Sequence, residues 1–327
     1  MRLLVTGGAG FIGSHFVKRM LAAGEDVVVL DKFTYAGNEA NLPPGFECRR
    51  GDIAVREDVE QVGPVDAIVN FAAETHVDRS ILGPAEFILT DVLGTQVLLD
   101  RARHHGLRFL QVSTDEVYGD VEPGWSSRED DPLRPSSPYS AAKAGGDLQV
   151  LAAVRTFGVN ASVTRGSNTY GPNQYPEKVL PLFTTNALDG EPLPLYGDGK
   201  QVRDWLHVDD HCSGIELVLR EGQPGEVYNV AANEEHENVE LTNLVLEHLG
   251  ADRSLIRHVE DRAGHDRRYS LDTAKIRTLG WEPRRDWEDG VRATIDWYRD
   301  NRDWWEPIKR SGGFREYYER QYAARLA

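Results

Sequence analysis

The first half of the chain alternates short apolar runs with segments that have helical periodicity. Apolar runs at 3–5, 26–30, 67–71 and 109–112 are bounded by polar turns, which predicts buried strands. A helix is predicted at 11–23, and apolar residues recur at helical spacing between 87 and 98. Because strands that alternate with helices form parallel sheets covered on both faces, the pattern predicts an α/β fold with a doubly wound parallel sheet.

The second half of the chain has a different character from about residue 165 onward. It is richer in proline and glycine, and it predicts a further buried strand at 227–230 and helices at 241–249 and 287–298. A chain of 327 residues is also longer than one core usually serves. We therefore expect a larger domain of residues 1–165, with a return segment near 200–232, and a smaller mixed α/β domain of 166–199 and 233–327.

The balance of charges limits the partners of this chain. It contains 37 basic and 53 acidic residues, a formal net charge of −16. Nucleic acids and anionic membranes attract basic surfaces, so neither is an expected partner, whereas an anionic small molecule needs only a local basic pocket. The two distant cysteines, Cys48 and Cys212, predict no disulfide framework, and no apolar run has the length of a membrane span. We expect a soluble, cytoplasmic protein.

Three glycines follow the first predicted strand at the mouth of the first predicted helix. Gly7, Gly10 and Gly13 permit a tight turn and let the backbone approach a pyrophosphate at the helix N-terminus. Asp31 ends the next strand, where a carboxylate accepts hydrogen bonds from an adenosine ribose and repels a 2′-phosphate. The arrangement predicts a Rossmann-type sheet that binds NAD rather than NADP. The alternative is a tight turn beside a surface aspartate.

A tyrosine and a lysine are candidates for acid–base chemistry. Tyr139 and Lys143 are four residues apart, so on a helix they share a face, and Pro138 is typical of a helix start. An ammonium beside a phenol favours the phenolate and is expected to lower the tyrosine pKa. A Tyr-x-x-x-Lys spacing is commonplace, but Ser113 and Thr114 follow the apolar run at 109–112, where a parallel sheet faces its ligand.

These features together resemble the extended short-chain dehydrogenase/reductases, and within them the dTDP-glucose 4,6-dehydratase family. The resemblance extends to about Trp305 and rests on five stretches: Ala-Glu-Thr-His-Val-Asp-Arg-Ser at 73–80, Ser-Thr-Asp-Glu-Val-Tyr-Gly at 113–119, Asn-Thr-Tyr-Gly-Pro at 168–172, Pro-Glu-Lys at 176–178 and Gly-His-Asp-Arg-Arg-Tyr at 264–269. It implies a homodimer, through helices in 85–103 and 139–154. The cofactor-binding residues that we expect are Gly7, Gly10, Phe11, Ile12, Gly13, Asp31, Asp52, Ile53, Ala72, Tyr139 and Lys143.

The resemblance implies a dehydration that consumes no NAD. Tyr139 is the expected base for oxidation at sugar C4, and Thr114 is expected to hydrogen-bond the C4 oxygen. The ketone acidifies the C5 proton, which Glu116 is expected to remove while Asp115 protonates the leaving C6 hydroxyl. Burial and mutual repulsion would keep one carboxyl protonated while the other ionises. Outside this context an adjacent acid pair is usually a solvated loop.

The substrate that the resemblance implies is a nucleotide-diphosphate sugar, with dTDP-glucose favoured. An arginine fork suits phosphate oxygens, and Arg203 and Arg262 are the best candidates. The full set of expected substrate-binding residues is His76, Ser113, Asn168, Glu177, Lys178, Arg203, Asn238, Arg262 and His265, although a surface arginine or a packed histidine is the plainer reading of each alone. We expect no metal site, because the acidic and histidine cluster at 207–211 is typical of a helix start. Asp91 and Ala263 stand where the family usually has asparagine and proline.

Two other classes of function remain open from the sequence. A nucleotide-sugar 4-epimerase or a UDP-glucuronate decarboxylase would share the fold, but epimerisation has no use for the pair Asp115 and Glu116. A non-catalytic NAD-sensing or scaffold protein would have no need to keep Thr114, Tyr139 and Lys143 together with that pair.

Overall fold

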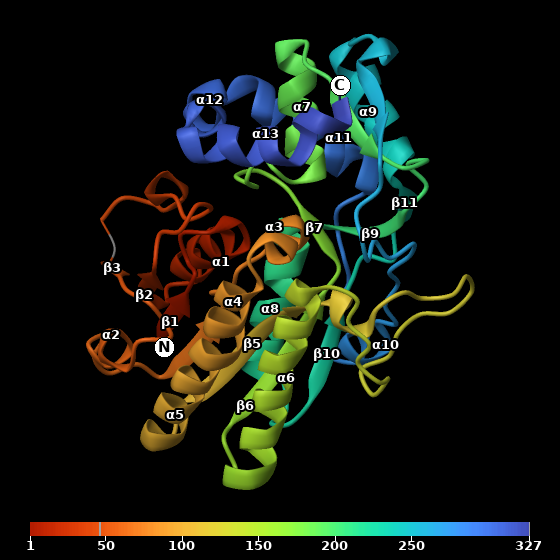
Figure 1. The fold of residues 1–327 in the computed structure, drawn as a ribbon. Helices are drawn as coiled ribbons and strands as arrows, with labels where there is room; N and C mark the ends of the chain where they lie inside the picture. The colour runs from red at the N-terminus through yellow and green to blue at the C-terminus, as the bar shows by residue number, and fades with distance from the viewer. Residues whose placement is uncertain (46, 327) are drawn as a thin grey trace.

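The computed structural model describes residues 1–45 and 47–326 and is built around a parallel sheet (Figure 1). The seven strands of this sheet lie in the order β10-β6-β5-β4-β1-β2-β3, and each neighbouring pair is parallel. They are β1 Arg2–Thr6, β2 Asp26–Asp31, β3 Glu47–Arg50, β4 Ala67–Asn70, β5 Arg108–Thr114, β6 Ala161–Gly166 and β10 Val227–Val230. This confirms the predicted α/β class and its doubly wound parallel sheet.

Helices cover both faces of the sheet because the strands are apolar on both sides. One face packs on Phe16 of α1 and Ile215 of α8, and the other on Leu98 of α5 and Val150 of α6. The covering helices are α1 Phe11–Ala22, α8 Val208–Glu221, α2 Arg56–Glu60, α5 Thr95–His105 and α6 Pro138–Phe157. Figure 1 shows α5 and α6 side by side in front of the strands.

The order of the strands creates a crevice beside β1. The chain moves from β1 to β2 on one side and later to β4 on the other, so the connections diverge at the carboxyl ends of β1 and β4. A doubly wound sheet binds its ligands at such a reversal. We therefore expect the ligand-binding residues to follow strands β1, β2, β4, β5 and β6.

Two smaller sheets lie beyond the carboxyl ends of the large sheet (Figure 1). One is β11-β9-β7, with β11 antiparallel to β9, and the other is the parallel pair β12-β8. The strands are β7 Asn168–Tyr170, β8 Leu193–Tyr196, β9 Val202–His207, β11 Glu235–Glu237 and β12 Ile256–Val259. Apolar side chains such as Phe183, Leu241 and Ile295 form a core of their own there. The helices of this region are α7 Val179–Asp189, α9 Asn238–Leu249, α11 Trp287–Asp300, α12 Arg302–Arg310 and α13 Gly312–Leu326.

The predicted return segment at 200–232 divides between these two regions. Its α8 and β10 belong to the large sheet, whereas its β9 pairs with β7 and β11. We propose to keep the division at about residue 165, where β6 ends, because the small sheets and their core begin directly after it.

Short helices complete the chain. They are α3 Val77–Leu82, α4 Pro84–Phe87, α10 Ala274–Arg277 and the 3-10 turns η1 Glu39–Asn41, η3 Asp115–Tyr118 and η4 Arg253–Leu255. The periodic segment at 87–98 is helical, as predicted, but Ile88–Gly94 forms a π-helix, η2, between α4 and α5. In the described part of the chain, no helix is long and apolar enough to cross a bilayer.

Candidate active site

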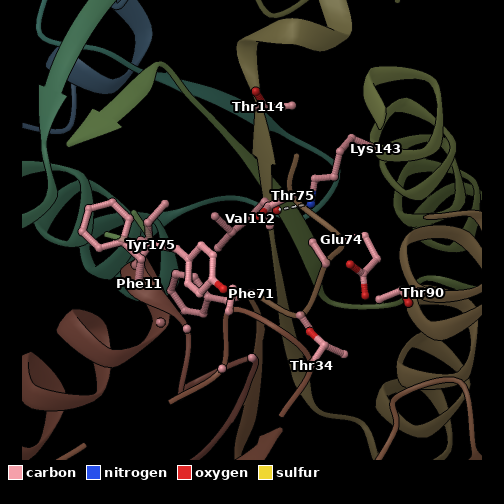
Figure 2. Close-up of a pocket in the computed structure, with 18 of the residues that line it drawn as sticks. Phe11, Thr34, Phe71, Glu74, Thr75, Thr90, Val112, Thr114, Lys143 and Tyr175 are labelled. Atoms are coloured by element: carbon pink, nitrogen blue, oxygen red, sulfur yellow. Dashed lines mark hydrogen bonds between the residues drawn. The ribbon is translucent and has the colours of Figure 1, made fainter. Parts of the chain in front are cut away.

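A pocket of about 270 Å³ opens at the carboxyl ends of β1, β2, β4, β5 and β6. It brings together all eleven residues expected to bind the cofactor and the three others expected to act in catalysis, Thr114, Asp115 and Glu116. Three of the expected substrate residues, Ser113, Asn168 and Lys178, also line it. Residues that lie far apart in the sequence therefore meet in one cavity, part of which Figure 2 shows.

The glycine turn after β1 is shaped for a pyrophosphate. Gly7 has a φ of +66°, and a Cβ there would lie 2.6 Å from the Ala72 backbone nitrogen. A Cβ at Gly13 would lie 2.3 Å from the Gly7 carbonyl oxygen. The helix α1 that follows has no side-chain cap, so the N–H groups of its first turn are free to bind an anion. These residues fit the pyrophosphate of NAD.

Asp31 lies at the end of β2, where the adenosine ribose is expected. Its two carboxylate oxygens accept the backbone N–H groups of Ala9, at 2.9 Å, and Phe33, at 2.7 Å. Burial raises the pKa of Asp31, and the two hydrogen bonds act in the opposite direction. Asp52 forms an ion pair with Lys32 at 2.8 Å on the same wall of the pocket. This end therefore offers a fixed carboxylate as an acceptor for ribose hydroxyls.

Tyr139 and Lys143 project from the first turns of α6. The helix begins with a capping box between Ser137 and Ser140, and Pro138 occupies its first position. The Lys143 ammonium forms its hydrogen bond with the main chain and not with the Tyr139 hydroxyl. Its Nζ donates to the Val112 carbonyl oxygen at 2.9 Å (Figure 2).

The expected lowering of the Tyr139 pKa is wrong for this arrangement. Burial raises that pKa well above its ordinary value, and the charges of Glu116, Asp91 and Asp115 raise it further. The Thr114 hydroxyl is a neighbour that acts in the opposite direction. Sequence reasoning took the Lys143 ammonium into account, but not the effect of the three nearby carboxyls on the phenol.

Asp115 and Glu116 have different surroundings although they are adjacent. Asp115 is buried, and its Oδ1 accepts the Thr114 hydroxyl at 3.1 Å. Burial and the nearby Glu116 raise the pKa of Asp115 to about 8. Burial also raises the pKa of Glu116, but the cations of three side chains, Arg262, Arg203 and Lys178, oppose that rise. The three cations therefore favour the ionised form of Glu116, whereas burial and Glu116 favour the protonated form of Asp115.

The two expected phosphate-binding arginines lie deep in the protein behind Glu116. The Arg203 guanidinium lies over the Tyr269 ring and donates to the Asp266 carbonyl oxygen at 2.9 Å. Arg262 lies 3.5 Å from an Asp78 carboxylate oxygen, and its Nε has no hydrogen-bond partner among the described residues. Both side chains thus extend the polar wall of the pocket beyond Glu116.

The remaining predicted substrate residues do not line the pocket itself. Glu177 is paired with Arg79 at 2.8 Å, His265 with Asp261 at 2.5 Å, and His76 packs against the Tyr317 ring. Asn238, at the start of α9, has a buried side-chain oxygen without a partner in the described part of the chain, as does the pocket residue Asn168. Glu177 pairs with Arg79 through Oε2 only, so its Oε1, like the side-chain oxygens of the two asparagines, has no partner among the described residues.

Sequence reasoning missed several side chains of the pocket, among them Tyr35, Glu74, Thr90, Tyr175 and His211. Figure 2 shows Glu74 and Thr90 among the side chains that line the pocket. Glu74 stands in the stretch at 73–80 that carries the resemblance, so a signal existed for it. Thr90 had none, since it lies on the π-helix within an ordinary amphipathic pattern.

The cluster at 207–211 forms a helix start, as expected. The His207 ring accepts the backbone N–H of Asp209 and caps α8. Within the described residues there is no group of three or more side chains of the kinds that hold metal ions.

The geometry agrees with comparisons to known proteins. The sequence model of the family described as GDP-mannose 4,6 dehydratase matches residues 4–294. The dTDP-glucose 4,6-dehydratase of Streptomyces niveus is 54% identical, over 94% of this chain and 96% of the relative. The solved structure of DesIV, a dTDP-glucose 4,6-dehydratase from Streptomyces venezuelae with NAD bound, is similar with a TM-score of 0.92 and 54% identity, covering 94% of this chain and all of that one.

An epimerase is a more distant match. The UDP-glucose 4-epimerase of Thermus thermophilus, solved with NAD, has a TM-score of 0.88 and 33% identity, over 92% of this chain and all of that one. The sequence identity of this chain to the two dehydratases, 54%, is higher than its identity to the epimerase, 33%. This chain belongs to the dTDP-glucose 4,6-dehydratase family.

Proposed function

We propose that this chain converts dTDP-glucose to dTDP-4-keto-6-deoxyglucose, with the loss of one water and with NAD returned to its starting state. The observation that carries the proposal is the contrast within one pocket between Asp115, whose pKa burial raises to about 8, and Glu116, where three cations oppose the rise in pKa. An elimination across C5 and C6 needs an acid and a base on neighbouring atoms, which this pair supplies.

Each step has a residue placed to perform it. Bound NAD supplies the hydride acceptor for C4 and the hydride donor for C6. Tyr139 accepts the proton of the C4 hydroxyl as a phenolate, a form that the positive charges of Lys143 and of bound NAD would favour against the burial that raises its pKa. The Thr114 hydroxyl beside it holds the C4 oxygen. Glu116 then removes the C5 proton, and Asp115 gives its proton to the departing C6 oxygen. Burial of both carboxyls excludes the water that would otherwise equalise their acidity.

The binding roles follow from charge and position. Gly7, Gly13 and the first turn of α1 hold the pyrophosphate of NAD, and Asp31 holds the adenosine ribose. Arg203 and Arg262 are the donors for the diphosphate of the substrate, because their positive charges act on Glu116 at the edge of the pocket and a guanidinium fork suits phosphate oxygens. Asn168 and Asn238 contribute acceptors that the protein leaves unpaired within the described residues.

Incubation with dTDP-glucose tests this function through the mass of the product. A product one water lighter than the substrate supports dehydration. An unchanged mass with inverted stereochemistry at C4 would instead support an epimerase. Absence of turnover with every nucleotide sugar would favour a scaffold protein. If this site catalyses the turnover, Tyr139→Phe should abolish it.

We further propose a homodimer located in the cytoplasm. Apolar side chains are exposed on the outer surface of α3, η2 and α6, where the helices of 85–103 and 139–154 lie side by side. They are Ile81, Leu82, Ile88, Leu89, Leu93 and Leu148. A second copy of this surface would cover them, because a two-fold interface brings one patch against itself. The cytoplasmic location stays a prediction from the two cysteines.

A further inference from the structure

Asp91 is a buried acid that lacks hydrogen bonds. The residue is 1% exposed, and neither carboxylate oxygen has a hydrogen-bond partner among the described residues. The nearest cation is Lys143, whose Nζ lies 3.7 Å from Oδ1, too far for a hydrogen bond. Burying a carboxylate without hydrogen-bond partners costs folding free energy. A role for Asp91 in the neighbouring site would account for such a group at this position.

The backbone holds Asp91 close to α6. Asp91 lies on the π-helix η2, and its carbonyl oxygen accepts the Thr95 hydroxyl at 2.7 Å. A Cβ at Gly146 of α6 would lie 2.7 Å from that same carbonyl oxygen, so only a glycine lets the two helices approach so closely. The carboxyl is therefore fixed against the helix that carries Tyr139 and Lys143.

Three groups with charge face Asp91. Lys143 and Tyr139 come from α6, and Glu74 comes from the loop that follows β4. Glu74 is itself influenced by Lys32 and Glu86 on its other side. Burial raises the pKa of Asp91 to about 7, with Lys143 lowering it and Glu74 raising it. Asp91 can therefore gain or lose its charge near neutral pH.

We propose that Asp91 is a positioning residue that holds the Lys143 ammonium beside η2 and so controls how readily Tyr139 gives up its proton. Among the described residues the Lys143 ammonium donates one hydrogen bond, to Val112, and its other two donors are left for a ligand or for a closer approach to Asp91, 3.7 Å away. An ionised Asp91 draws this ammonium toward η2 and adds a negative charge that opposes a phenolate at Tyr139. A protonated Asp91 does neither.

This inference rests on the proposed function, and one experiment separates the two. In a Glu116→Gln background, single-turnover mixing with dTDP-glucose follows the absorbance of reduced nicotinamide between roughly pH 5.5 and 9, a range that spans the Asp91 pKa of about 7. Absence of any such absorbance contradicts the proposed function. Its presence, with identical pH profiles for Asp91 and for D91N, contradicts only the role of Asp91.

The expected result is a pH-dependent difference between the two proteins. D91N should form reduced nicotinamide at a pH lower by about one unit, since a like charge is removed from near the phenol. The two rates should converge below about pH 6, where Asp91 is protonated, and diverge above about pH 7. Asp100→Asn is the matched control, because it removes a carboxylate from the neighbouring α5 that pairs with Arg56 instead. D100N should leave the profile unchanged.

A second measurement needs neither cofactor nor substrate. Ionisation of a carboxyl whose folded pKa is raised destabilises the fold as pH rises between its ordinary value and the raised one. D91N should therefore melt close to the parent protein at pH 4.5 and above it at pH 8. Asp91→Ser serves the same comparison if D91N does not fold. A melting difference that is constant with pH would contradict a titrating Asp91.

Discussion

Asp115 lies buried under the Thr114 hydroxyl, whereas Glu116, the next residue, faces the cations of three side chains. The 3-10 turn η3, which begins at Asp115 directly after β5, produces this difference, because successive side chains of a tight turn point to different surroundings. The proposed division of acid and base roles between the two residues rests on that turn.

Glu116→Gln should separate oxidation from elimination. The amide cannot remove the C5 proton, so overall turnover should fall by about 10²–10⁴-fold. Tyr139 is untouched, so C4 oxidation remains possible and the absorbance of reduced nicotinamide should accumulate on mixing with dTDP-glucose. Glu122→Gln, an exposed carboxyl near the same turn, is the control. Equal loss of both steps in Glu116→Gln would exclude the proposed role.

The acid role of Asp115 predicts a falling activity at alkaline pH. Its pKa is raised to about 8, so the proton needed by the leaving hydroxyl is present below that pH and is lost as pH rises through it. Elimination measured from the 4-keto stage should decline across that range. Asp115→Asn should be slow throughout and should lack this decline, whereas Asp130→Asn, at an exposed site, should keep it. An alkaline limb that survives in Asp115→Asn would assign the decline to another group.

The position of Asp31 leads us to expect that this residue sets the preference for NAD over NADP. Asp31→Ala removes the acceptor for the ribose, so NAD should bind about 10- to 100-fold more weakly. Loss of the negative charge should at the same time improve binding of NADP relative to NAD. Titration calorimetry with each cofactor measures both effects. Asp31→Asn repeats the test with less disturbance to Ala9 and Phe33, and Asp26→Ala, at the exposed start of β2, is the control. Unchanged preference in both Asp31 variants would exclude the ribose contact.

The proposed dimer predicts that one apolar side chain of η2 decides assembly. Ile88 is 57% exposed, and Ile88→Asp would place a charge in the centre of the proposed interface. Sedimentation should then show a monomer where the parent protein is a dimer. Val55→Asp alters an exposed apolar residue on a different surface and should leave the dimer intact. Monomers in all three proteins would contradict the proposed assembly.

Hydrophobic periodicity predicted five strands of the large sheet, but not its β3 and β6 and none of the strands of the smaller sheets. The strand at 227–230 matches β10, and the run at 109–112 lies within β5, because buried parallel strands are continuous apolar runs. The strands β7, β9 and β11 contain Asn168, Arg203 and His236 among other polar residues, so they give no such signal. Their pairing depends on contacts between distant segments, which a local pattern does not record.

The position of a site residue could be predicted from the sequence where a motif sets that residue directly after a predicted strand. Gly7 and Asp31 could be located in this way, and so could Thr114. The electrostatics of Tyr139 could not, since they depend on Asp91, which approaches from a helix about fifty positions earlier in the chain. Similarly, nothing in the sequence connects α13 to the site, yet Tyr317 of that helix packs on the His76 ring.

We expect helix α13 to affect substrate binding through a chain of contacts that leads to Arg262. Gln321 of α13 donates to the Tyr196 hydroxyl at 2.6 Å, and that hydroxyl donates to Asp78 at 3.1 Å. Asp78 in turn lies 3.5 Å from Arg262, which faces Glu116. Gln321→Leu keeps the size of the side chain but removes its donor, so the Tyr196 hydroxyl and Asp78 lose part of their support.

Gln321→Leu should therefore raise the KM for dTDP-glucose about fivefold, the effect of one ordinary hydrogen bond, and leave kcat nearly unchanged. The reason is that Arg262 contributes to holding the substrate in all its states, whereas Tyr139, Asp115 and Glu116 are not displaced. Glu316→Gln, on the exposed side of the same helix, should change neither constant. A fall in kcat without a change in KM would show that α13 acts on the chemistry itself, and unchanged constants would reduce the helix to a packing element.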